Sequence, residues 1–291
     1  MLLLPSPRLG SRVLRCEPRC RSVAASSLRG GAEASGSDLL ERPSKIMSRR
    51  GLASRRESER LMREGKVKVN GNVHRNPGDK IRTDSSILIV GEEDLVRPSI
   101  LLHKPVGVVS TQPDRRLKQV PAWELLTEEN HDPGARDSSV VAREVTSEPW
   151  HMAVAGRLDK DSRGLLLMTQ DGVLAKRVIG TKDVWKRYVV TVDEEPSKEQ
   201  IRKLNTPMTL DGVRLKPMRV ALSAPEARSP RVLEFELREG RKHQIRRCCS
   251  KVGLRVVDLF RTQIGPWKIA DLEEGKWRLL AREEIDLLRG Q

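Results

Sequence analysis

Residues 156–168 read Gly-Arg-Leu-Asp-Lys-Asp-Ser-Arg-Gly-Leu-Leu-Leu-Met, a charged loop between two glycines that runs directly into four apolar residues. Glycines beside an apolar stretch predict a rigid loop presented at the end of a buried strand over Leu165–Met168. Asp159 in this loop is a candidate carboxylate nucleophile, because an aspartate that is partly desolvated near cations can attack an electrophile. The residues alone leave open the ordinary alternative, in which an aspartate in a loop flanked by glycines only forms a turn.

The rest of the second half alternates short strands with short helices. Val189–Val192 and Val232–Leu237 are typical of strands, and Ser197–Leu204 is typical of a helix. Residues 127–150 are polar and contain prolines, so we expect a long surface loop or insertion there. The segment lacks both a regular βαβ alternation and a glycine-rich phosphate loop, which excludes a dinucleotide-binding fold. The pattern predicts an α+β fold.

The charge of the chain points to nucleic acid. Its 291 residues include 55 Lys and Arg against 40 Asp and Glu, a formal net charge of +15. A balance this basic is typical of nucleic-acid partners, although solubility alone is the alternative. Aromatic residues make up only 3% of the chain, which argues against RNA binding mainly by base stacking. No apolar run approaches the ~20 residues of a membrane span, so we expect no membrane association.

Positive charge is densest over residues 42–91, where basic residues outnumber acidic ones by more than two to one. Ser54 followed by Glu57 is a capping-box pattern that begins a helix. Asn70-Gly71 predicts a hairpin turn after a strand that begins near Lys66. Basic charge on a short helix and the following hairpin suits contact with RNA phosphates, and a solvated helix face is the alternative.

Two further stretches carry candidate site residues. Tyr188, the only tyrosine, begins a strand, where it is either a core residue or a platform for an extruded base. Residues 239–247 read Glu-Gly-Arg-Lys-His-Gln-Ile-Arg-Arg and predict the start of a basic helix. Its arginines suit bidentate binding of a carboxylate or phosphate. His243 has no obvious serine, cysteine or metal partner, so we expect it to contact RNA or to form a structural hydrogen bond.

The first 40 residues have a different composition. They contain six arginines and no lysine, and only Glu17 and Glu33 precede Asp38 as acidic residues. This composition is typical of an organelle transit peptide, and a disordered extension without an address is the alternative. We expect a chloroplast address, with the mitochondrion as the alternative.

The cysteines predict neither a metal site nor a disulfide framework. Cys16 and Cys20 lie in the leader, while Cys248 and Cys249 are adjacent and have no metal-spaced histidine nearby. We therefore expect Cys248 and Cys249 to be buried, reduced thiols, and we expect no metal ion.

Two resemblances extend these observations. Arg49–Arg56 (Arg-Arg-Gly-Leu-Ala-Ser-Arg-Arg) together with Glu64–Gly71 (Glu-Gly-Lys-Val-Lys-Val-Asn-Gly) resembles an S4-type RNA-binding domain. The loop of Asp159, then Lys-x-Tyr ending at Tyr188, then residues 239–247, in that order, is similar to the pseudouridine synthases of the RsuA/RluB/RluE/RluF family. The resemblance covers roughly residues 42–284.

The composition of the first 40 residues and the two resemblances together predict three segments. They are a transit peptide or disordered leader over 1–40, an S4-like domain over 42–91, and a catalytic domain over 97–288. The catalytic domain would have a mixed, mainly antiparallel sheet flanked by helices and loops. The implied partner is ribosomal RNA or a pre-ribosomal particle, and we expect a monomer.

The resemblance also implies residue roles. Asp159 would be the catalytic nucleophile, Tyr188 would pack on the target base, and Arg246 would form an ion pair with Asp159. Arg157 would hold the RNA open where the uridine leaves its stack. The other residues for which we infer RNA contact are Arg49, Arg50, Arg55, Arg56, Lys66, Lys68, Arg241, His243 and Gln244.

The implied reaction breaks the N-glycosidic bond of a uridine, turns the uracil and rejoins it through carbon to the same ribose. Bonds are exchanged within one nucleotide, so we expect no cofactor. The alternative function is a non-catalytic RNA-binding or ribosome-assembly factor on the same fold. Asp159, Tyr188 and Arg246 favour the enzyme, because a protein that only binds phosphates has no use for a carboxylate in its cleft.

Overall fold

A computed structural model of the chain describes residues 40–91, 97–111, 113, 116, 118–133, 139–180, 184–223 and 230–289. The leader expected over residues 1–40 lies outside the described residues, except for Leu40. Within the described ranges, no helix has both the length and the apolar character needed to cross a membrane.

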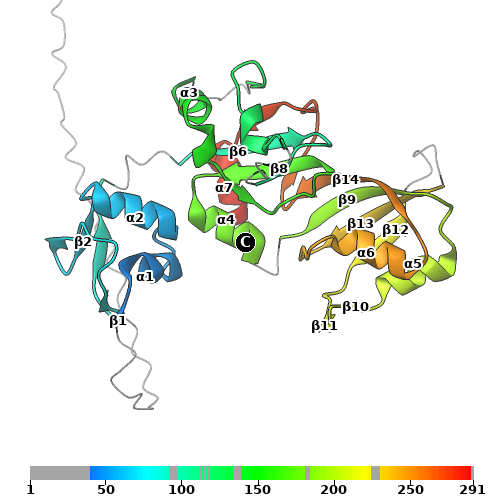
Figure 1. Cartoon of the computed structure of the whole chain (residues 1–291), viewed down its shortest axis with the longest axis horizontal. Helices are drawn as coiled ribbons and strands as arrows, with labels where there is room; N and C mark the ends of the chain where they lie inside the picture. Colours follow the sequence, from blue (N-terminus) through cyan, green and yellow to red (C-terminus); the bar gives the residue numbers. More distant parts are fainter. Residues whose placement is uncertain are drawn as a thin grey trace, which may run out of the picture. The chain divides into compact units, whose positions relative to one another are not determined.

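Residues 40–91 form a small α+β unit. Its two helices enclose an apolar cluster with a three-stranded antiparallel sheet, in the order β3-β2-β5 (Figure 1). Leu61 and Met62 are fully buried in this cluster. The elements are β1 (Leu40–Glu41), α1 (Pro43–Arg49), α2 (Arg55–Arg63), β2 (Val67–Val69), β3 (Asn72–Val73), β4 (Ile81–Arg82) and β5 (Ile87–Ile89), with β1 paired to β4.

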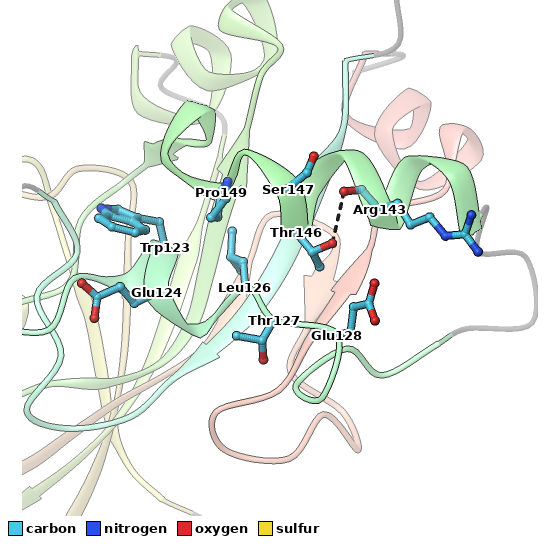
Figure 2. Close-up of a pocket in the computed structure, with 9 residues that line it drawn as sticks. All are labelled: Trp123, Glu124, Leu126, Thr127, Glu128, Arg143, Thr146, Ser147 and Pro149. Atoms are coloured by element: carbon cyan, nitrogen blue, oxygen red, sulfur yellow. Dashed lines mark hydrogen bonds between the residues drawn. The ribbon is translucent and has the colours of Figure 1, made fainter.

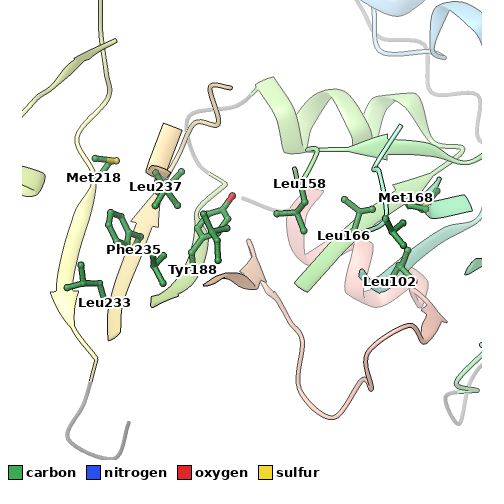
Figure 3. Close-up of a cluster of buried hydrophobic side chains, with 14 of the residues drawn as sticks. Leu102, Leu158, Leu166, Met168, Tyr188, Met218, Leu233, Phe235 and Leu237 are labelled. Carbon is green, nitrogen blue, oxygen red and sulfur yellow. The ribbon is translucent and has the colours of Figure 1, made fainter. Parts of the chain in front are cut away.

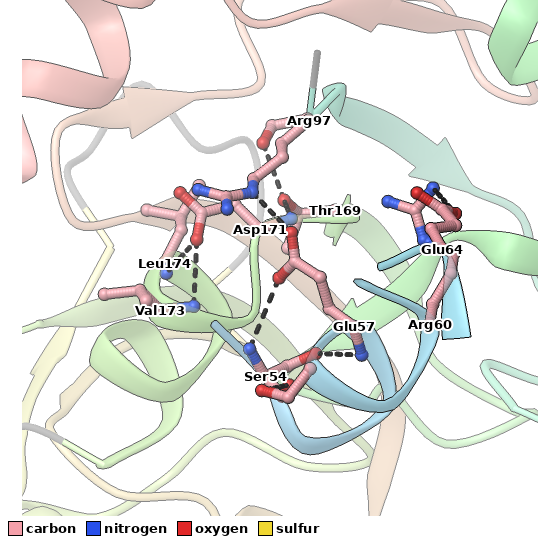
Figure 4. Close-up of polar contacts among 11 residues, drawn as sticks. Ser54, Glu57, Arg60, Glu64, Arg97, Thr169, Asp171, Val173 and Leu174 are labelled. Atoms are coloured by element: carbon pink, nitrogen blue, oxygen red, sulfur yellow. Dashed lines mark hydrogen bonds and ion pairs between the residues drawn. The ribbon is translucent and has the colours of Figure 1, made fainter. Parts of the chain in front are cut away.

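The capping box at the start of α2 is formed as predicted. The Ser54 hydroxyl accepts from the Glu57 amide at 3.2 Å, and the Glu57 carboxylate accepts from the Ser54 amide at 3.3 Å (Figure 4). The expected hairpin follows, because Asn70 and Gly71 adopt φ values of 49° and 85° between β2 and β3. Both conformations suit Asn and Gly better than most residues.

The remainder of the described chain is built on one mixed sheet (Figure 1). Its strand order is β12-β13-β9-β14-β8-β6-β16, with β15 added to β14 and β7 added to β8. Every pair is antiparallel except β14 with β8. The α+β class and the mainly antiparallel sheet are therefore confirmed. The strands are β6 (Ser99–Lys104), β7 (Ala153–Ala155), β8 (Arg163–Thr169), β9 (Lys186–Val192), β12 (Arg219–Leu222), β13 (Val232–Leu237), β14 (Val256–Ile264), β15 (Trp267–Lys268) and β16 (Trp277–Leu279).

Helices and a hairpin complete this part of the chain. Asp171 caps α4, since its carboxylate accepts the amides of Val173 and Leu174 (Figure 4). Ser197 caps α5 through a second capping box with Gln200. The elements are η3 (Ala122–Leu125), α3 (Ser139–Ser147), η4 (Pro149–His151), α4 (Gly172–Gly180), α5 (Lys198–Asn205), β10 (Thr209–Leu210), β11 (Val213–Arg214), α6 (Gln244–Lys251) and α7 (Arg282–Arg289).

The central strands carry apolar residues on both faces, so a core forms on each side of the sheet. Leu166 and Met168 of β8 belong to one cluster, and Leu165 and Leu167 belong to the other. Figure 3 shows part of the first cluster, from Leu102 and Leu166 to Phe235. This two-sided burial explains why β8 is a continuous apolar run rather than an alternating one.

The long surface loop expected over residues 127–150 is wrong in part. The segment contains α3, of which Ala142 and Val145 are buried in the first core cluster. Residues spaced three apart lie on one face of a helix, so their burial stabilises a helix that the polar composition did not predict. Residues 134–138 lie outside the described part.

Candidate active site

The loop that carries Asp159 joins β7 to β8 and is bound to the fold along its length. The Ser110 hydroxyl accepts from the Leu158 amide at 2.9 Å and donates to the Leu158 carbonyl at 2.6 Å. The Gly107 amide donates to the Lys160 carbonyl at 2.9 Å. The side chain of Leu158 is buried in the core. Both neighbours of Asp159 are thus fixed, while its own carboxylate stays 39% exposed.

Arg261 of β14 holds the same loop through hydrogen bonds from its buried guanidinium. Its side chain is only 1% exposed, and it donates to three backbone carbonyls. The distances are 2.7 Å to Leu165, 2.8 Å to Gly156 and 3.4 Å to Arg157. No role was predicted for Arg261, although an arginine directly after Leu259 and Phe260 in a strand is a usable signal. Buried charge is costly unless it is hydrogen-bonded, so a lone arginine in a strand predicts specific acceptors.

Glycine at the ends of the loop has a conformational reason. Gly156 and Gly164 adopt φ values of 91° and 112°, which side chains with a Cβ rarely adopt. A Cβ on Gly164 would also lie 2.3 Å from the carbonyl oxygen of Arg261. The expectation that these glycines shape a tight loop is therefore confirmed.

The basic side chain that pairs with Asp159 is His243 and not Arg246. The Nε2 atom of His243 lies 3.5 Å from Oδ1 of Asp159. The expected ion pair between Arg246 and Asp159 is absent from the described part of the chain. Arg246 instead donates to the Asp161 carbonyl at 2.7 Å, the Ser162 hydroxyl at 3.3 Å and the Val256 carbonyl at 3.3 Å. These acceptors hold its guanidinium against the C-terminal end of the loop, beyond Asp159.

Gln244 does not face a ligand, so its predicted RNA contact is wrong. Its side chain is 3% exposed. Its amide oxygen accepts from the Arg241 backbone amide at 2.9 Å, and its Nε2 donates to the Glu239 carboxylate at 3.2 Å. These bonds fix the turn that precedes α6. The side chains of Arg241 and His243 in the same turn are exposed.

Tyr188 lies in the core and is 7% exposed. It pairs across the sheet with Phe235 of β13 on one side (Figure 3). On the other side it pairs with Arg261 of β14. The strand register therefore places Tyr188 beside the arginine that supports the Asp159 loop. Arg157, in contrast, has an exposed side chain on the loop itself.

Two buried lysines add positive charge beneath the loop. Burial, then Arg261, lowers the pKa of Lys104 to about 8, while Asp159 and Asp161 act in the opposite direction. Burial, then Arg261 and Lys216, lowers the pKa of Lys186 to about 8. Lys104 donates to the carbonyls of Pro105 and Val108, and Lys186 donates to those of Val178 and Val184.

The cysteines Cys248 and Cys249 are buried free thiols, as expected. Burial raises the pKa of both thiols, that of Cys249 to about 12. Such thiols are poor nucleophiles, since the thiolate is the reactive form. Neither cysteine is therefore a candidate for covalent chemistry.

A surface hollow of about 650 Å³ lies elsewhere, between η3 and α3, and is shown in Figure 2. Trp123, Leu126 and Pro149 form its apolar part. The Thr146 hydroxyl donates to the Arg143 carbonyl at 3.1 Å on its wall. None of the predicted site residues lines this hollow, so we do not assign the chemistry to it.

In the small N-terminal unit, the predicted RNA-contacting residues differ in how their charges are used. Arg49 and Lys66 form ion pairs with Glu41 and Glu64. Arg50 donates to the carbonyls of Thr83 and Ser85. The remaining three, which have no ion-pair partner within the described ranges, are Arg55, Arg56 and Lys68.

Comparison with known proteins agrees with this architecture. The family model described as RNA pseudouridylate synthase matches residues 99–251, and the model described as S4 domain matches residues 44–87. A crystal structure of a pseudouridylate synthase superposes with a TM-score of 0.56 over 85% of this chain and 99% of that chain. Its sequence identity is 23%, so this likeness shows a shared fold.

Two similar sequences cover most of the chain. The ribosomal large subunit pseudouridine synthase B of Bacillus subtilis is 32% identical over 257 residues, which are 86% of this chain and 96% of that protein. The dual-specificity RNA pseudouridine synthase RluF of Escherichia coli is 33% identical over 260 residues, which are 87% of this chain and 80% of that protein. With its N-terminal S4 domain, the chain belongs to the RNA pseudouridylate synthase family.

Proposed function

We propose that this protein isomerises a uridine of ribosomal RNA to pseudouridine. The Bacillus subtilis relative is named for the large ribosomal subunit, and the S4 domain adds a basic RNA-binding unit to the catalytic domain. The net charge of +15 suits a long phosphate backbone rather than a free nucleoside. The enzyme is an isomerase, because every bond that breaks is replaced within the same nucleotide.

Asp159 carries the chemistry in this proposal. The single observation on which the assignment rests is the loop that fixes both neighbours of Asp159 while its carboxylate stays exposed. A fixed and accessible carboxylate is what nucleophilic attack or proton abstraction on a bound nucleotide requires. The N-glycosidic bond breaks, the uracil turns, and a carbon–carbon bond to the same ribose replaces the lost bond.

The other site residues would act on the RNA or on the loop. Arg157 is exposed beside Asp159, where it can occupy the space that the flipped uridine leaves. Tyr188 would pack on the target base from the core side of the site. Arg246 would hold the C-terminal end of the loop through Asp161 and Ser162.

The test of the proposed function is single-turnover pseudouridine formation on ribosomal RNA transcripts. Asp159→Asn preserves the shape of the side chain and removes its charge, so we expect a rate at least about 1,000-fold below wild type. RNA affinity is expected to stay within about threefold, since one half-exposed carboxylate does not anchor phosphates. Wild-type turnover by Asp159→Asn would refute the assignment, and RNA binding without turnover by the wild-type protein would indicate a non-catalytic binding factor.

We further propose that the arginine-rich leader directs the protein to the chloroplast, with the mitochondrion as the alternative address, and that the protein acts as a monomer. Six arginines and no lysine in the first 40 residues support import. A fluorescent fusion to residues 1–40 tests the address, and light scattering of the purified protein tests its oligomeric state.

Pseudouridine mapping of organellar ribosomal RNA with and without the protein identifies the target. An unchanged organellar map would contradict the proposed compartment.

A further inference from the structure

His243 occupies an unusual position at the start of α6. Its backbone lies in the left-handed region, with φ 51° and ψ 32°, although the residue carries a Cβ. Side chains disfavour this region, and such residues persist only where the surroundings dictate the conformation. The consequence is that the imidazole points across to the Asp159 loop, where Nε2 lies 3.5 Å from Oδ1 of Asp159.

The turn that holds His243 is built from bonds that do not involve its ring. The Gln244 side chain joins the Arg241 amide to the Glu239 carboxylate. The Glu239 carboxylate also accepts from the Lys216 amide at 2.9 Å. The His243 carbonyl accepts the first helical bond, from the Arg247 amide at 2.9 Å. The backbone is thus fixed independently of the ring, and the imidazole remains available to Asp159.

We propose that His243 is a positioning residue for Asp159, which orients the carboxylate and supplies a positive charge only when the imidazole is protonated. The inference rests on the proposed role of Asp159 as the catalytic carboxylate. A distance of 3.5 Å is a charge contact longer than an ordinary hydrogen bond, so its strength depends on the charge of the ring. Histidine side chains as a class change charge between about pH 5 and pH 8, so this is the range over which a contribution of the ring charge is sought.

The other charged groups around the pair keep their charge across most of this range. Lys104 beneath the loop loses its proton only near its lowered pKa of about 8. Arginine and lysine side chains ordinarily keep their charge throughout this range. Arg246, Arg247 and Lys251 of α6 line a hollow of about 350 Å³ together with His243. The neighbouring charged residues are Arg157, Lys160 and Asp161 of the loop, Lys104 of β6, Arg246, Arg247 and Lys251 of α6, and Asp211 of the β10–β11 hairpin, which pairs with Arg247.

The experiment compares His243→Asn with wild type in single-turnover reactions at saturating RNA. Asparagine tolerates the left-handed backbone and carries no charge, so it removes the charge with the least disturbance of the turn. We expect the variant to react within about twofold of wild type at about pH 7.5 and about fivefold more slowly at about pH 5.5. His243→Lys restores a permanent charge, so it is expected to recover part of the rate at the lower pH.

A matched control is available on the same protein. His151 pairs with Glu148 at 2.8 Å, and both side chains are about half exposed, as in the His243 pair. His151→Asn is therefore expected to leave the pH profile of the rate unchanged. Circular dichroism at both pH values verifies that each variant is folded.

Two outcomes overturn the inference in distinguishable ways. If Asp159→Asn is inactive while His243→Asn keeps the wild-type pH profile, His243 does not act through Asp159, and a change confined to RNA affinity would assign it to RNA contact. If Asp159→Asn is fully active, the proposed role of Asp159 fails and the role of His243 fails with it.

Discussion

Arg261 shows how one buried side chain shapes the site. Its guanidinium satisfies the carbonyls of Gly156, Arg157 and Leu165, which flank Asp159 on both sides. Arg261→Met leaves these carbonyls without a donor, and each unsatisfied buried group costs about 1–3 kcal/mol. Loss of the buried charge offsets part of this cost, so we expect the free energy of unfolding to fall by about 2 kcal/mol.

The same substitution is expected to slow the reaction by about tenfold at a temperature where the variant is fully folded, because the loop is held less accurately. Urea denaturation and single-turnover kinetics measure the two effects. Arg187→Met is the control, since Arg187 is exposed and forms a surface ion pair with Glu236. A variant of Arg261 with wild-type stability and rate would show that its three bonds do not position the loop.

Lys186 gives a pH-dependent prediction. Its pKa in the folded protein is lowered to about 8, mainly by burial, whereas an unfolded lysine titrates near about pH 10.4. Between these values the unfolded chain binds more protons than the folded chain, so the lysine becomes less unfavourable to folding as the pH rises.

We therefore expect wild type to gain stability relative to Lys186→Met between about pH 8 and pH 10, by at most about 1.4 kcal/mol per pH unit. Below about pH 7 the difference between the two proteins is expected to be constant. Denaturant titrations of both proteins at several pH values test this. A difference that falls with rising pH, or that stays constant throughout, would contradict a lowered pKa.

At the level of single residues, the sequence predicted the rigid loop around Asp159 better than it predicted which side chains meet there. Asp159 is exposed on a fixed loop, as a nucleophile requires, and its glycines have the expected backbone angles. The predicted RNA contact of Gln244 and the predicted ion pair between Asp159 and Arg246 were wrong. The spacing of a residue in a motif does not say which side of a turn its side chain faces. Sequence alone does not distinguish Gln244, which is used inside the turn, from His243, which points out of it.

Among the elements, β8 and β14 approach each other so closely that no side chain fits between their backbones at Gly164. Of the strand pairs of this sheet that the structure describes, this pair alone is parallel, and Gly164 lies opposite Arg261 in it. Gly164→Ala places a Cβ 2.3 Å from a backbone oxygen and at a φ of 112°, so either strand must shift. We expect a loss of about 3 kcal/mol in the free energy of unfolding, as for other strongly overpacked backbone contacts.

Gly240→Ala is the matched control for this prediction. A Cβ on Gly240 meets nothing within 4 Å, and its φ is not in the positive region. We expect its stability to remain within about 0.5 kcal/mol of wild type. Equal melting temperatures for the two alanine variants would show that the strands can separate without cost.

Helices and turns that begin with a strong local sequence signal, such as a capping box, were predicted correctly. A helix that depends on distant contacts was not. The capping boxes at Ser54 and Ser197 and the Asn70-Gly71 turn each fix a boundary through bonds that involve only neighbouring residues. Helix α3 was missed because its stability comes from Ala142 and Val145 packing against distant parts of the chain. Tertiary burial of this kind cannot be inferred from the composition of the segment.

The whole molecule joins an RNA-binding unit to a catalytic sheet, and its positive charge is divided between the two. The order of motifs along the chain was enough to predict both units and the class of fold. It could not predict which of the many basic side chains are neutralised by neighbouring carboxylates, because those pairs depend on packing. Among the residues that the structure describes, Arg55 and Arg56 have no carboxylate partner, whereas Arg82 in the same unit pairs with Asp84.

This division of charge predicts how RNA affinity depends on salt. Each cation that contacts a phosphate releases condensed counterions, and contributes about 0.7–0.9 to the slope of log affinity against log salt. Replacing Arg55 and Arg56 together by Gln is therefore expected to lower the slope by about 1.5 and to weaken binding most at low salt. Arg82→Gln is expected to change the slope by less than about 0.5, because Asp84 already pairs with Arg82.

Fluorescence anisotropy of a labelled ribosomal RNA fragment at five salt concentrations measures both slopes. Equal slopes for the double variant and wild type would mean that the helix α2 does not contact the RNA backbone, and that the catalytic domain supplies the electrostatic part of binding.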